Sequence, residues 1–101
     1  LCGAAKDEKA DKIAEIMTGE NALTKATLSM ACFKYDALLM IDKDKYKDYI
    51  LNDIRVKYKK MLDLGATSFW ETEKGDSDFS NAGSLCHGWS AMPVYYFSIL
   101  L

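Results

Sequence analysis

The sequence has little proline, histidine or cysteine, and each shortage excludes a class of protein. One proline and six glycines among 101 residues are too few for a collagen-like or proline-rich low-complexity chain. Three widely spaced cysteines, Cys2, Cys32 and Cys86, form no disulfide framework, and free thiols favour a cytoplasmic localisation. The single histidine gives no zinc-ligand spacing, and there is no glycine-rich phosphate motif, so we expect no metal and no cofactor.

The sequence also lacks a charge excess of either sign and a long hydrophobic run. A formal net charge of −2 and an isoelectric point near 5.3 argue against binding to nucleic acid. Residues 1–20 lack the basic start and apolar block of a signal peptide. Residues 79–101 carry no formal charge, but their first half is polar. We therefore expect a buried C-terminal helix and no membrane span.

What remains is the composition of a globular protein, with 50% hydrophobic and 28% charged residues. The length suits one domain. The chain begins with Leu1 and ends at Leu101, inside an apolar stretch that has no cap, no glycine and no closing basic residue. We interpret residues 1–101 as a single partial domain, a fragment of a larger one.

Hydrophobic periodicity predicts an all-α fold built from helical hairpins. The predicted helices span residues 4–18, 28–41, 43–63 and 91–101. Because one to three residues separate the second helix from the third, these two should form an antiparallel hairpin. A long irregular loop is predicted at about 65–90, where four of the six glycines gather.

Residues that start or stop helices stand at these predicted boundaries. Gly19 can end the first helix, because glycine adopts a left-handed ending at little cost. Thr27, Asp42 and Ser90 can cap the second, third and last helices. Pro93 falls in the first turn of the last helix, where its missing N–H costs nothing.

The predicted helix at 28–41 is apolar on nearly every side, with only Lys34 and Asp36 charged. Such a helix is expected to be buried on nearly every side, which a chain this short can achieve only with partners. The isolated chain should therefore self-associate through exposed apolar helix faces. The lysines of the following helix are interpreted as a solvated face.

The predicted loop holds the residues best suited to chemistry, namely Trp70, Glu71, His87 and Trp89. Indole faces stack on the C–H faces of pyranoses, and carboxylate and imidazole groups bond sugar hydroxyls. The alternative is that both tryptophans are core anchors and Glu71 is a surface carboxylate.

Two further alternatives for chemistry in this loop are weaker. The oxygen ligands at 76–80 lack the glycine and distal glutamate of a calcium loop. Adjacent side chains such as Cys86 and His87 rarely face each other as nucleophile and base.

Two stretches of this loop carry a family resemblance. The first motif, residues 65–71 (GATSFWE), and the second motif, residues 84–91 (SLCHGWSA), resemble bacterial α-L-rhamnosidase-like enzymes of glycoside hydrolase family 78. The segment from Thr27 to Leu38 is similar to the helix pair that precedes the first motif in these enzymes. The resemblance covers most of the chain. It implies the C-terminal part of a six-hairpin (α/α)6 toroid, the catalytic domain of this family.

The resemblance also implies an activity, the inverting hydrolysis of a terminal glycosidic bond of a carbohydrate substrate. Such enzymes use two carboxyl groups, one protonating the leaving oxygen and one activating water. By its place in the first motif Glu71 matches the general base, and Trp70, His87 and Trp89 match positions that line the sugar pocket. The acidic motif that supplies the general acid has no match here, so the isolated chain should be inactive. The alternative is a non-catalytic helical module that binds a carbohydrate or a partner through the same loop.

Overall fold

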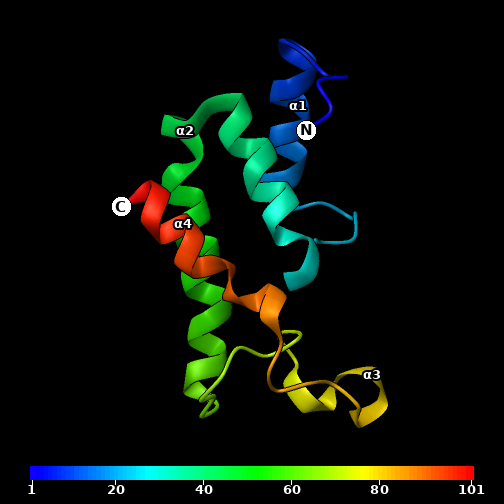
Figure 1. The fold of residues 1–101 in the computed structure, drawn as a ribbon. Coiled ribbons are helices and arrows are strands. Elements are labelled where there is room, and N and C mark those ends of the chain that lie inside the picture. Colours follow the sequence, from blue (N-terminus) through cyan, green and yellow to red (C-terminus); the bar gives the residue numbers. More distant parts are fainter.

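The computed structural model describes residues 1–101, and all of its regular structure is helical (Figure 1). The elements in chain order are α1 (Glu8–Thr18), α2 (Leu28–Asp63), η1 (Gly75–Ser77), α3 (Asp78–Asn81), η2 (Gly88–Ala91) and α4 (Met92–Leu100). The prediction of an all-α fold is confirmed. No helix combines the length and the apolar character that crossing a membrane requires.

The element α2 is a helical hairpin. Its backbone leaves the helical conformation at Asp42 (φ −159°, ψ 103°), and the chain reverses direction there, so the two halves run antiparallel (Figure 1). Asp42 Oδ1 accepts a hydrogen bond from the backbone N–H of Lys45 at 3.0 Å. This is the bond by which an N-cap residue satisfies an unpaired donor of the first helical turn. The predicted pair of helices divided at Asp42 is therefore confirmed.

Other predicted boundaries are only partly right. Helix α1 begins at Glu8, four residues later than predicted. Thr27 stands at the N-cap of α2, but its hydroxyl meets Ser29 Oγ at 3.0 Å and caps no backbone N–H. The N-cap predicted at Ser90 is wrong, because this residue is buried inside η2 and its Oγ has no hydrogen-bond partner. Pro93 does lie in the first turn of α4.

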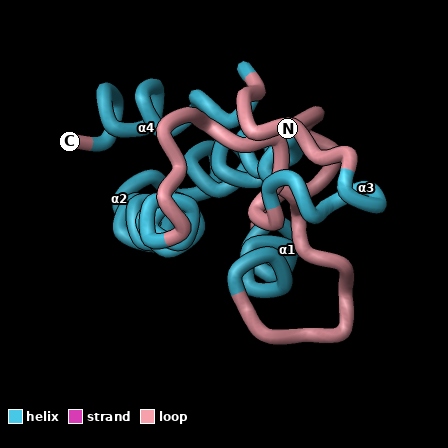
Figure 2. The backbone as a smooth tube through the Cα atoms, turned by 90° about the horizontal axis from the view of Figure 1, so that it is seen from below, coloured by secondary structure: helices cyan, strands magenta, loops and turns pink.

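The core lies between the two halves of α2 and the helices on either side of them. Helix α1 lies beside the first half of α2, whereas α4 runs along the second half in the opposite direction (Figures 1 and 2). The main core consists of Ala14, Ala31, Tyr35, Leu38, Tyr46, Ile50, Ile54, Tyr96 and Leu100. The first half of α2 is expected from the sequence to be buried on nearly every side. Within this chain it is not, because three of its apolar side chains stay more than half exposed, namely Met30, Phe33 and Met40.

A half-buried carboxylate joins the two halves of α2. Asp53 Oδ2 accepts hydrogen bonds from Tyr35 Oη at 2.9 Å and Lys57 Nζ at 3.1 Å, and Lys34 Nζ lies 3.4 Å away. Burial alone would raise the pKa of the Asp53 carboxyl, but Lys57, the Tyr35 hydroxyl and Lys34 outweigh it and hold this pKa below its usual value. Burial and the Asp53 charge raise the pKa of Tyr35, which therefore remains a donor at neutral pH.

We expect Asp53 to make the stability of the fold dependent on acid pH. A carboxyl whose pKa is lower in the folded chain than in the unfolded chain stabilises the fold fully above the unfolded pKa, and this contribution is lost as the pH falls through the folded pKa. Asp53→Asn should therefore lower the free energy of unfolding at pH 7 by about 2 kcal/mol and flatten its decline as the pH falls below about 4. Urea unfolding at several pH values measures both effects.

The matched control is Asp63→Asn, because Asp63 forms a salt bridge with Lys59 in which both side chains are more than half exposed. An exposed pair of this kind contributes about 0.5 kcal/mol or less. Equal losses of stability at pH 7 for the two variants would contradict the role given to Asp53.

Candidate functional site

The first and second motifs lie side by side in the structure. The backbone N–H of Glu71 donates to the carbonyl of Ser84 at 2.8 Å, and that of His87 donates to the carbonyl of Phe69 at 2.7 Å. The first and second motifs therefore pair in an antiparallel direction, although neither forms a regular strand. This pairing closes residues 72–83 into a separate loop and brings together candidate residues from both motifs.

Glu71 is held by its backbone and by one carboxylate oxygen. Its Oε2 accepts a hydrogen bond from the backbone N–H of Ser84 at 3.1 Å, and its carbonyl oxygen accepts one from Trp89 Nε1 at 2.9 Å. The residue is half-buried. Its Oε1 forms no hydrogen bond within the chain, so one oxygen of a positioned carboxylate is left for a ligand or a water molecule.

His87 and Trp89 form a stacked aromatic pair beside Glu71. Their ring centroids lie 3.6 Å apart and their planes differ by 27°. The side chain of Trp89 is 43% exposed, whereas that of His87 is half-buried with its Nδ1 enclosed and without a hydrogen-bond partner. The structure thus brings Glu71, His87 and Trp89 together and leaves the partly exposed indole of Trp89 bonded to the backbone of Glu71.

Trp70 has a different environment from these three residues. Its side chain is only 9% exposed and packs against Leu28 and Met61 of α2. Gly75 lies against its ring so closely that a Cβ at this glycine would stand 2.8 Å from Trp70 Cε3. Trp70 therefore fixes the loop to the helical hairpin from the inside, as the core-anchor alternative proposed, and its buried side chain is not part of the exposed aromatic pair of His87 and Trp89.

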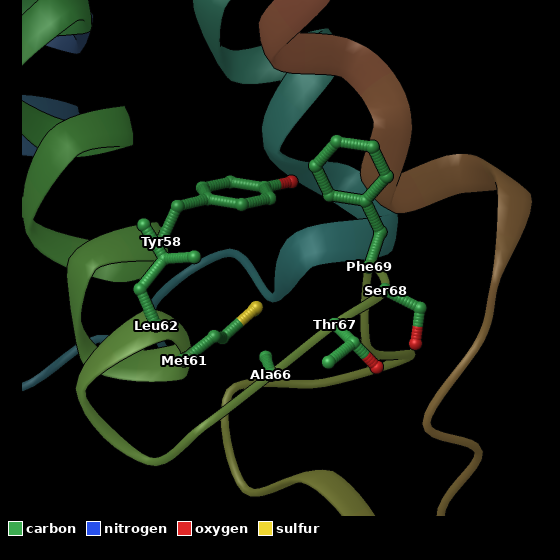
Figure 3. A pocket seen from close by; sticks show the side chains of 7 residues that line it. All are labelled: Tyr58, Met61, Leu62, Ala66, Thr67, Ser68 and Phe69. Atoms are coloured by element: carbon green, nitrogen blue, oxygen red, sulfur yellow. The ribbon is translucent and has the colours of Figure 1, made fainter.

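A pocket that the sequence did not indicate lies between α2 and the first motif. It has a volume of about 260 Å³, and its lining residues are Tyr58, Met61, Leu62, Ala66, Thr67, Ser68 and Phe69 (Figure 3). Tyr58 and Phe69 point toward one another across it, with ring centroids 5.9 Å apart in an edge-to-face arrangement. From hydrophobic periodicity Tyr58 could be assigned to the apolar stripe of its helix but not to this pocket. Its partner Phe69 lies in an irregular segment, where periodicity predicts no contacts.

The hydroxyl of Tyr58 connects this pocket with the second motif. It donates a hydrogen bond to the carbonyl of Ser90 at 2.6 Å. Burial raises the pKa of Tyr58 to about 12, so the hydroxyl stays protonated at neutral pH. Its hydrogen bond to Ser90 holds the start of α4 against α2.

The remaining candidates of the loop do not form a site in the structure. No group of three or more histidine, cysteine, aspartate or glutamate side chains is close enough to hold a metal ion. Asp78 Oδ1 instead accepts the backbone N–H of Phe79 at 3.0 Å, at the start of a turn in which residues 79–81 all have positive φ. Cys86 is exposed, and no hydrogen bond joins its thiol to His87.

Comparison of the chain with known protein families, characterised proteins and solved structures finds no match. The interpretation of the site therefore depends on the geometry of this chain. That geometry defines an all-α hairpin fold whose largest loop presents one fixed carboxylate and one exposed indole.

Proposed function

We propose that the chain is part of an α-L-rhamnosidase-like glycoside hydrolase with an (α/α)6 toroid, and that its loop forms one wall of the sugar site. The observation that supports this proposal is the pairing of the two motifs, which gathers Glu71, His87 and Trp89 although 18 residues of sequence separate the first from the last. A carboxylate and an exposed indole on the same loop suit a pyranose ring, since one can bond its hydroxyls and the other can stack on its C–H face.

In this proposal Glu71 is the general base of an inverting hydrolysis. The N–H of Ser84 fixes Oε2, and Oε1 accepts a proton from the water that attacks the anomeric carbon. A second carboxyl group, roughly 6.5–9.5 Å away, would protonate the leaving oxygen. No residue of this chain matches the family's motif for that group. We therefore expect residues 1–101 alone to bind sugar without turning it over.

The test is the hydrolysis of 4-nitrophenyl α-L-rhamnopyranoside by the full-length protein that contains these residues. We expect release of 4-nitrophenol, with the β-anomer of L-rhamnose as the first product seen by proton NMR. A first product with the α configuration would contradict the inverting mechanism. Failure to hydrolyse any member of a panel of aryl glycosides would contradict the enzymatic function.

The second candidate function is a non-catalytic carbohydrate- or partner-binding module. The observation that favours it is the hydrogen bond from Ser84 N–H to Glu71 Oε2, because a carboxylate that ties two segments together can have a purely structural role. If its ligand is a carbohydrate, this candidate predicts sugar binding without hydrolysis even in the full-length protein.

A glycoside hydrolase and a carbohydrate-binding module both predict that Trp89, and not Trp70, responds to the sugar. We expect L-rhamnose at millimolar concentration to change the tryptophan fluorescence of the chain and of Trp70→Phe, but not that of Trp89→Phe. The two variants form a matched pair, since one indole is 43% exposed and the other is 9% exposed. A response that persists in Trp89→Phe would place the sugar elsewhere, and no response in the unsubstituted chain would contradict sugar binding by this loop.

A further inference from the structure

An apolar groove runs between the second half of α2 and α4. Its volume is about 550 Å³, and it is lined by Leu51, Ile54, Arg55, Tyr58, Lys59, Leu62, Phe69, Pro93, Val94, Phe97 and Leu101. On the α4 side, Val94 and Leu101 are 66% and 86% exposed. Helix α4 has no charged residue, and a helix without a polar face is normally buried all round. Here only the side with Pro93, Tyr96 and Leu100 is buried.

A charged stripe borders this groove along α2. It consists of Asp44, Asp48, Leu51, Arg55 and Lys59, which are spaced by three or four residues and so lie along one side of the helix. Its first end is acidic and its second end is basic. Like charges four residues apart weaken an isolated helix by a few tenths of a kcal/mol, whereas the helix dipole favours acids near the N-terminal end and bases near the C-terminal end of this half of α2.

Within the chain the charges of the stripe are mostly without partners. Asp48 and Arg55 take part in no salt bridge, and Lys59 pairs only with Asp63, outside the stripe. Asp48 and Arg55 are seven residues apart, which is about 10.5 Å along a helix, and they form no ion pair within the chain. The acidic end of the stripe is therefore free to meet a basic end on a second molecule.

The order of the charges fits a second copy of the same chain. If two α2 helices lie antiparallel about a two-fold axis between Leu51 and Asn52, Asp48 of each copy faces Arg55 of the other. In the same register Asp44 faces Lys59, because both pairs are centred on the same point. A two-fold interface has this reciprocal form, in which a surface is complementary to itself.

We propose that two copies of this chain form a closed dimer through the charged stripe and the apolar groove beside it. The uncharged residues of α4, Val94, Phe97 and Leu101, supply apolar surface that association removes from water. The charges at the border fix the register and the antiparallel orientation. This proposal specifies the helix faces through which the chain self-associates, and it is independent of the proposed sugar site.

Charge reversal tests the register. Sedimentation velocity of residues 1–101 across a concentration series should show a monomer–dimer equilibrium. Asp48→Arg and Arg55→Asp should each raise the dissociation constant at least about tenfold, because each places like charges in contact twice across the two-fold axis. The double variant exchanges the two charges and should return the dissociation constant to within about threefold of the original. A double variant as weak as either single variant would overturn the proposal.

A pair of matched substitutions tests whether the apolar groove lies in the dimer interface. Val94 and Val56 are 66% and 62% exposed, but Val94 lines the groove and Val56 does not. Val94→Asp should abolish dimerisation, and Val56→Asp should leave it unchanged, with far-ultraviolet circular dichroism showing that both variants are folded. Three results would overturn the proposal: a monomer at every concentration, open-ended association beyond a dimer, or equal effects of the two substitutions.

Discussion

Replacing Glu71 by glutamine should reduce the hydrolysis of an aryl α-L-rhamnoside by the full-length protein about a hundredfold to ten-thousandfold. Glutamine keeps a carbonyl oxygen that can accept the N–H of Ser84 in place of Oε2, and it keeps the backbone bonds to Ser84 and Trp89. It cannot take a proton from water. The loss should therefore appear in kcat with KM nearly unchanged, since the interaction removed acts in the transition state.

The matched control for this substitution is Glu73→Gln. Glu73 lies two residues further along the same loop, is also half-buried and falls outside both motifs. It should retain full activity. Unchanged turnover in Glu71→Gln would show that Glu71 is not the base, and a rise in KM with unchanged kcat would assign it to substrate binding alone.

The helical part of the fold could be predicted because its signals are local. Asp42 illustrates this, since a short polar side chain between two apolar periodic segments both ends one helix and caps the next. Ser90 shows the limit of the same reasoning. It has the residue type of an N-cap, but the start of α4 is fixed by tertiary contacts, among them the hydrogen bond from Tyr58. These contacts bury Ser90 inside η2, so its side chain cannot cap.

The composition of the candidate site could be predicted, but the environments of its residues could not. Trp70 and Trp89 are the same residue type in the same loop. Trp70 is nevertheless buried against α2, whereas Trp89 stacks on His87 and is partly exposed. Their difference follows from hydrogen bonds between segments more than a dozen residues apart, such as Glu71 to Ser84. Periodicity carries no information on such pairing. Only the resemblance of the two motifs to one family suggested that they belong together.

We expect Gly83→Ala to destroy the candidate site and to leave the helical hairpin intact. A Cβ on Gly83 would stand 1.9 Å from the carbonyl oxygen of Gly75, and real Cβ atoms do not approach backbone this closely. Gly75 cannot move away, because it packs against Trp70 and its φ of +60° suits glycine. The loop must therefore open, and its opening breaks the adjoining bonds between Ser84 and Glu71.

Gly88→Ala is the matched control for this loss. A Cβ at Gly88 meets nothing within 4 Å, so alanine should be accepted there with no change in sugar response. In Gly83→Ala we expect the fluorescence response of Trp89 to L-rhamnose to disappear and proteolysis to concentrate in residues 72–85, while the helical circular dichroism is kept. The core of α1, α2 and α4 includes no residue of this loop. The sugar response can therefore be lost while the helices stay folded. A sugar response that survives Gly83→Ala would show that the site does not depend on the pairing of the two motifs.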